Sequence, residues 1–122
     1  MSKRILVVDD EVDVIEFLKN LLEDNGYGVR TALDGVAAME QVKQSRPDLI
    51  LLDLQMPEET GTGFYRKLRS RKGLRDIPVI VISGLAGRDV AVSKSVVVID
   101  KPPGEAELLD EVRKALDGQS AD

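Results

Sequence analysis

Short runs of large apolar residues alternate along the chain with segments in which apolar residues recur every three or four positions. The runs are Ile5–Val8, Leu49–Leu52, Val79–Ile82 and Val96–Ile99. An uninterrupted apolar run of this length is typical of a strand that is buried on both faces, and such strands occur in parallel sheets. A weaker alternating stretch from Tyr27 to Ala32 predicts a further strand, at an edge of the sheet.

Helices are predicted between these strands from the spacing of their apolar residues. The apolar stripes consist of Val12, Ile15, Leu18, Leu21 and Leu22 in the first helix; Val36, Ala37, Ala38, Met39 and Val42 in the second; Phe64, Tyr65 and Leu68 in the third; and Leu108, Leu109, Val112 and Leu116 in the last. Asn25-Gly26 is expected to end the first helix and Asp34 to cap the second. The third helix is expected from about Phe64 to Lys72, after a loop from Met56 to Gly63.

Strands that alternate with helices predict an α/β fold with a doubly wound, five-stranded parallel sheet. The segment from Gly84 to Lys94 departs from the pattern, because its two glycines and β-branched Val90 and Val92 give low helix propensity where a crossover helix is expected. We therefore expect a shortened or irregular fourth helix there. A chain of 122 residues is expected to form a single domain over residues 1–122.

Composition removes several kinds of chemistry. The chain has no cysteine and no histidine, which excludes Cys/His metal sites, serine–histidine triads and a phosphohistidine on this chain. A net charge of −5 argues against direct nucleic-acid binding, because contacts to phosphates supply most of that affinity. The basic stretch from Arg66 to Arg75 is more typical of a solvated face than of a docking site. Because no apolar run fits an export signal or a membrane span, we expect a cytoplasmic protein without membrane contact.

Polar side chains follow the ends of the predicted strands. They are Asp9, Asp10, Asp53, Ser83 and Lys101. The carboxyl ends of parallel strands lie at one edge of a sheet, so these side chains should lie close together. A cation would relieve the repulsion among the carboxylates, and Mg²⁺ suits this role because it takes few carboxylates and leaves room for a phosphoryl oxygen. Lysine can balance a phosphate, serine can donate to it, and a carboxylate such as the single, central Asp53 can accept it as a nucleophile.

Taken together, these residues resemble the receiver domains of two-component response regulators, the CheY-like superfamily. The resemblance rests on Val8-Asp9-Asp10-Glu11, Asp53-Leu54-Gln55-Met56-Pro57 with Gly61, Ser83, and Lys101-Pro102, and covers nearly the whole chain. It implies a flavodoxin-like sheet of order 2-1-3-4-5 and Asp53 as phosphoacceptor. It also implies Mg²⁺ bound by Asp10, Asp53 and the backbone carbonyl of Gln55, with Asp9 acting largely through water.

In the resemblance, Ser83 and Lys101 contact the phosphoryl group, and the Lys101–Pro102 peptide bond is cis. The phosphoryl donor would be a sensor histidine kinase or a phosphotransfer protein, and output would pass to a downstream protein that the sequence does not identify. The domain would be no enzyme beyond catalysing its own phosphorylation and dephosphorylation. Val98 stands where the family usually has an aromatic residue, so we expect switching to depend on ordering of the segment 84–94.

Other readings stay open at this stage. An aspartyl-phosphate-type phosphatase has a D-x-D motif after its first strand, whereas here Asp9 and Asp10 are adjacent. A flavodoxin-like FMN binder needs a glycine- and hydroxyl-rich loop where this chain has carboxylates. A pseudo-receiver that acts only as an interaction module would not need the phosphoacceptor set that this chain contains.

Overall fold

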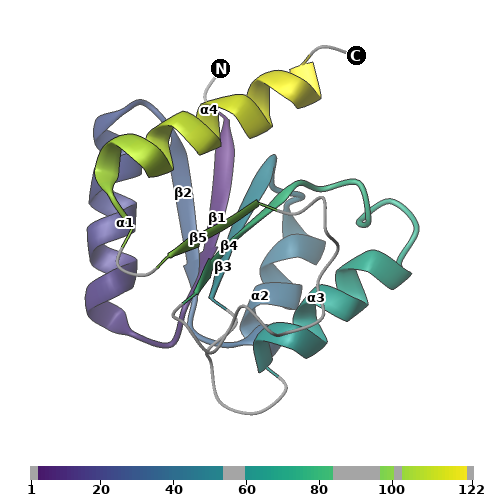
Figure 1. The fold of residues 1–122 in the computed structure, drawn as a ribbon. Helices are drawn as coiled ribbons and strands as arrows, with labels where there is room; N and C mark the ends of the chain where they lie inside the picture. Colours follow the sequence, from purple (N-terminus) through teal and green to yellow (C-terminus); the bar gives the residue numbers. More distant parts are fainter. Residues whose placement is uncertain (1–2, 54–59, 84–96, 101–102, 121–122) are drawn as a thin grey trace.

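The computed structural model describes residues 3–53, 60–83, 97–100 and 103–120, and its strands form one parallel sheet (Figure 1). The strands are β1 (Arg4–Val8), β2 (Gly28–Ala32), β3 (Leu49–Asp53), β4 (Val79–Ser83) and β5 (Val97–Asp100). Their order is β2-β1-β3-β4-β5, and every neighbouring pair is parallel. The predicted doubly wound fold and the sheet order implied by the resemblance are confirmed.

Four helices of the described residues cover the two faces of the sheet. They are α1 (Val12–Asp24), α2 (Gly35–Gln44), α3 (Thr60–Ser70) and α4 (Glu105–Ser120). Helices α1 and α4 lie on one face, and α2 and α3 lie on the other (Figure 1). The expected fourth crossover helix, over 84–94, falls outside the described residues. Within the described ranges, no helix combines the length and the apolarity that crossing a bilayer requires.

Alternation along the strands divides the core into two clusters. In β3, Leu49 and Leu51 pack with α1 and α4, whereas Ile50 and Leu52 pack with α2 and α3. All four side chains are at most 1% exposed, because successive side chains of a strand point to opposite faces and both faces are covered here. The central strand is therefore fixed in register from both sides, which also fixes the position of Asp53 at its end.

Local signals in the sequence place the ends of two helices as predicted. The Oδ1 atom of Asp34 accepts a hydrogen bond of 2.8 Å from the backbone N–H of Ala37 and so caps α2. Asn25 is the C-cap residue of α1, and Gly26 follows with a φ of +92°, a conformation that favours glycine.

Two expectations about the helices are wrong. Val12 and Val36 were expected on inward stripes but are 56% and 70% exposed. Each is the first or second residue of its helix, whereas the buried residues of α1 and α2 begin at Ile15 and Ala38. Helix α3 begins at Thr60 rather than near Phe64, although the threonines and glycines of its first turn have low helix propensity.

Candidate functional site

Four carboxylates gather at the carboxyl edge of the sheet. Asp9, Asp10, Glu11 and Asp53 each contribute one carboxylate oxygen to a cluster in which all these atoms lie within 4.8 Å of one another. Three of these residues follow β1 directly, and the fourth ends the neighbouring strand β3. The convergence therefore follows from the parallel pairing of β1 with β3.

Asp9 is anchored through its side chain and its backbone. Its Oδ1 atom accepts a hydrogen bond of 2.8 Å from the N–H of Glu11, and its own N–H donates to the carbonyl of Ala32 at 3.1 Å. The residue is only 2% exposed. A buried carboxylate of this kind has a fixed orientation, so it can hold a ligand or a water molecule in one place.

Asp53 is equally buried, at 2% exposure, and lies opposite Ile82 in the register of β3 and β4. Strand alternation places it on the same face as Leu49 and Leu51, the face that α1 and α4 cover. Its carboxylate therefore points to the side of the sheet on which α1 begins, directly after Glu11.

The cluster has a buried floor and an exposed opening. Asp9 and Asp53 form the floor, while Asp10 and Glu11 are exposed. The sequence from Ile5 to Leu18 contains no lysine or arginine, so this part of the edge is strongly acidic. An all-oxygen set of carboxylates that opens to solvent suits a hard divalent cation that keeps part of its water shell, which is the donor chemistry of Mg²⁺.

The structure brings together three of the predicted site residues, Asp9, Asp10 and Asp53. Ser83 is the last residue of β4, opposite Asp100 of β5, so its backbone lies at the same edge of the sheet. Gln55 and Lys101 lie outside the described residues, and so does the Lys101–Pro102 peptide bond. Sequence reasoning assigned no role to Glu11, although its place next to Asp10 was a signal that it could join the cluster.

Exposed apolar side chains follow β1 and β2 at the same edge of the sheet as the cluster. Val12, Leu33 and Val36, called here the apolar rim, are 56%, 51% and 70% exposed. Val12 follows Glu11 directly, and Leu33 follows Ala32, whose carbonyl accepts the hydrogen bond from Asp9. Val36 lies three residues after Leu33, at the start of α2, so the apolar rim belongs to the segments that leave β1 and β2 at the carboxyl edge of the sheet.

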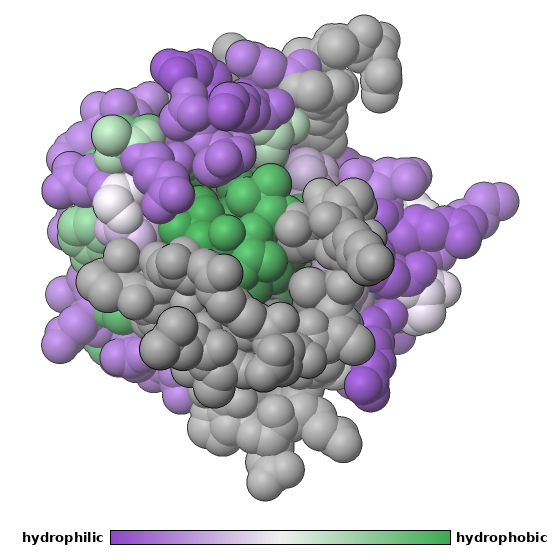
Figure 2. All heavy atoms as spheres, viewed as in Figure 1, coloured by the Kyte–Doolittle hydropathy of each residue, from purple (hydrophilic) through white to green (hydrophobic). Residues whose placement is uncertain are grey.

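A separate hollow of about 730 Å³ lies at the opposite end of β4, where Ile77, Val79 and Val97 contribute to its walls. Figure 2 shows an apolar area over β5, where Val97 and Val98 are each 37% exposed. Arg69 borders this hollow; its guanidinium stacks 5.0 Å from the centroid of the Tyr65 ring and donates to the carbonyl of Ile77 at 3.1 Å. This member of the basic stretch thus holds α3 against the sheet.

Comparison with known proteins identifies the family to which the chain belongs. The family model described as "Response regulator receiver domain" matches residues 5–113. The chain belongs to this family, and it is a receiver domain of the two-component response regulator type.

Relatives of different length share the match. Protein Rrf1 of Nitratidesulfovibrio vulgaris is 36% identical over 116 residues, which cover 95% of this chain and 84% of that protein. Response regulator MprA of Mycobacterium ulcerans is 42% identical over 124 residues, with 95% of this chain but only 51% of MprA covered. The chain thus spans about half the length of the MprA relatives that it matches.

Solved structures confirm the architecture. The signal receiver domain of a signal transduction histidine kinase from Syntrophus aciditrophicus superposes with a TM-score of 0.86 at 33% identity, covering 96% of this chain and 92% of that one. Chemotaxis protein CheY4 of Vibrio cholerae superposes with a TM-score of 0.82 at 25% identity, covering 95% and 100%. This chain therefore has the CheY-like, flavodoxin-like fold.

Proposed function

We propose that this receiver domain accepts a phosphoryl group on Asp53, with Mg²⁺ bound, from a phosphohistidine on a partner protein. The observation that carries the proposal is the acidic cluster, in which a buried aspartate at the end of the central strand lies within 4.8 Å of three other carboxylates. In a family whose members are signalling domains, such a carboxylate has the position and the chemistry of a phosphoacceptor.

In the proposed transfer, a carboxylate oxygen of Asp53 attacks the phosphorus of the donor. The new O–P bond forms as the N–P bond to the donor's imidazole breaks, and the imidazole leaves with the electron pair and takes up a proton. Attack of water on the phosphorus later releases inorganic phosphate and restores the carboxylate. The domain thus catalyses only its own phosphorylation and dephosphorylation.

Asp10, Asp53 and the backbone carbonyl of Gln55 would hold the cation, and Asp9 would act through a bound water molecule. When bound, Mg²⁺ neutralises part of the negative charge that the carboxylates and the phosphoryl oxygens bring together. Ser83 would donate a hydrogen bond to a phosphoryl oxygen, and Lys101 would balance its charge.

The proposed donor is a sensor histidine kinase or a phosphotransfer protein, because this chain has no histidine of its own. The apolar rim supports a protein as donor. A protein that delivers a phosphoryl group to Asp53 would dock at the carboxyl edge of the sheet, where the exposed apolar side chains of the rim can be buried on contact. Contacts with a downstream protein would then carry the signal.

Intact mass measurement after incubation with acetyl phosphate and Mg²⁺ tests the proposal. We expect one added phosphoryl group on the wild type and none on Asp53→Asn. Asp76→Asn is the matched control, since Asp76 is an exposed aspartate outside the cluster, and it should be phosphorylated as the wild type is. Undiminished uptake by Asp53→Asn, or by the wild type in excess chelator, would overturn the assignment.

A further inference from the structure

Glu11 has no part in the proposed phosphotransfer, yet its carboxylate lies in the acidic cluster. We propose that Glu11 tunes the site electrostatically: it strengthens binding of the divalent cation and weakens binding of the phosphoryl anion. This inference rests on the proposed function and assigns a further positioning residue to the same site.

The backbone of Glu11 is held on both sides. Its N–H donates to Oδ1 of Asp9 at 2.8 Å, and its carbonyl accepts a hydrogen bond from the N–H of Ile15 at 3.1 Å. Glu11 is the N-cap residue of α1, a position where a side chain often bonds to the first backbone N–H groups of the helix, but it makes no such capping bond. Its carboxylate belongs instead to the cluster with Asp10 and Asp53.

The expected effect has opposite signs for the two ligands of the site. A carboxylate attracts a cation and repels an anion, and both ligands would lie close to Asp53, whose carboxylate oxygen is within 4.8 Å of that of Glu11. Because Glu11 is exposed, solvent screens the interaction, so the effect should be several-fold and should shrink at high salt. If the substitution of Glu11 only disturbed the position of Asp9, binding of both ligands would instead become weaker.

The test compares Glu11→Gln with Glu16→Gln. Glu16 is also exposed on α1 but lies outside the cluster, so the pair applies the same chemical change at two places on one helix. Isothermal titration calorimetry measures Mg²⁺ binding to each protein, and then beryllofluoride binding at saturating Mg²⁺ as a mimic of the phosphoryl group. Circular dichroism checks that both variants are folded.

We expect Glu11→Gln to weaken Mg²⁺ binding by about three- to tenfold and to strengthen beryllofluoride binding by about two- to fivefold, on the scale of a partly screened charge pair. Glu16→Gln should change each affinity by less than about twofold, because its charge is farther from the site and screened. Glu11→Asp, which keeps the charge, should recover part of the loss of Mg²⁺ affinity. At high salt, the affinities of Glu11→Gln for Mg²⁺ and beryllofluoride should differ less from those of the wild type.

The inference is overturned if Glu11→Gln and Glu16→Gln have the same affinities, or if Glu11→Gln binds both Mg²⁺ and beryllofluoride more weakly than the wild type does. Failure of the proposed function looks different. If Asp53 takes up no phosphoryl group while Mg²⁺ affinity still depends on Glu11, the proposed function is wrong and the role of Glu11 in cation binding stands. If the wild type binds no Mg²⁺, both proposals are wrong.

Discussion

The backbone N–H of Asp9 donates a hydrogen bond of 3.1 Å to the carbonyl of Ala32. The bond extends the pairing of β1 with β2 one residue beyond Val8, the last residue of β1. It ties the acidic cluster to the segment that leads from β2 into α2, so Leu33 is held at the same edge of the sheet as the carboxylates. One backbone hydrogen bond therefore links the acidic cluster to the part of the apolar rim that follows β2.

The apolar rim should matter for a protein donor and not for a small one. Leu33→Ser and Val36→Ser should each slow phosphoryl transfer from a phosphohistidine-bearing protein by about fivefold, because roughly 1 kcal/mol of apolar burial at the contact would be lost. Phosphorylation by acetyl phosphate should be unchanged, since that donor needs no protein contact. Rates of transfer, followed by radiolabel, give the comparison.

Val97→Ser is the control for the rim, because Val97 is also exposed but lies at the start of β5, away from the acidic cluster. It should leave both rates at the wild-type value. Equal slowing by all three variants would show that loss of surface hydrophobicity in general, and not the rim, is responsible.

Removal of the cation should lower stability measurably. A ligand that binds only the folded state at 100 times its Kd adds about 2.7 kcal/mol, so excess chelator should reduce the thermal midpoint of the wild type by several degrees. Asp10→Asn should lose most of this Mg²⁺-dependent shift. In chelator the variant should be at least as stable as the wild type, because one of four neighbouring carboxylates is no longer charged.

Asp13→Asn serves as the matched control for the cation experiment, as Asp13 is exposed in the first turn of α1 and lies outside the cluster. Scanning calorimetry should find its Mg²⁺-dependent shift intact. A full shift in Asp10→Asn would contradict the assignment of Asp10 to the cation.

The cap of α2 should contribute to folding independently of the site. Asp34→Ala removes the acceptor of the 2.8 Å hydrogen bond from Ala37 and should lower the free energy of unfolding by about 1 kcal/mol. Asp34→Ser should retain most of that stability. Asp24→Ala is the contrast, because Asp24 is the last residue of α1, where a negative charge opposes the helix dipole, and its removal should cost nothing. Urea denaturation at neutral pH measures all three, and equal losses at both sites would rule out the capping explanation.

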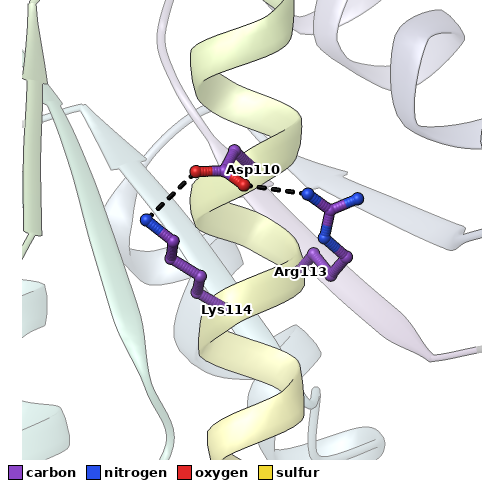
Figure 3. A network of polar contacts seen from close by, with 3 residues as sticks. All are labelled: Asp110, Arg113 and Lys114. Carbon is purple, nitrogen blue, oxygen red and sulfur yellow. Dashed lines mark hydrogen bonds and ion pairs between the residues drawn. The ribbon is translucent and has the colours of Figure 1, made fainter.

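An ion network on α4 predicts a pH dependence at an exposed surface (Figure 3). Asp110 bonds to Lys114 at 3.1 Å and to Arg113 at 2.8 Å. The hydrogen bond from Lys114, followed by that from Arg113, lowers the pKa of Asp110 below its ordinary value. A lowered carboxyl pKa stabilises the folded state above the ordinary carboxyl range, and this contribution disappears as the pH falls through the lowered value.

Asp110→Asn should therefore reduce the thermal midpoint slightly at neutral pH and not at all in strong acid. The effect should be small because all three side chains are exposed and solvent screens the pairs. Lys114→Gln should likewise lower the thermal midpoint slightly at neutral pH and not in strong acid, since it removes the ion pair between Asp110 and Lys114. A destabilisation by Asp110→Asn that persisted below the carboxyl range would point to helix propensity as its cause.

The sequence predicted correctly those structural features that are determined by residues close together in the chain. The cap of α2 by Asp34 and the end of α1 at Asn25-Gly26 are set by neighbouring residues, and both were predicted correctly. The start of α3 at Thr60 was missed, because local propensity opposes a helix there. The exposure of Val12 and Val36 was missed as well, because periodicity gives the side of a helix on which a residue lies, but not whether another element covers its first turn.

The same division runs through the site. The sequence by itself determined that Asp9, Asp10 and Asp53 would meet, because buried apolar runs force parallel strands and parallel strands bring their carboxyl ends to one edge. Only the tertiary structure decided which carboxylates form the floor and which the opening, and that Glu11 joins them. The reason is that burial depends on the distance of each residue from the covered part of the sheet, and the direction of the Glu11 side chain depends on how α1 leaves β1. Neither the burial of each carboxylate nor the direction of the Glu11 side chain can be predicted from the spacing of residues along the chain.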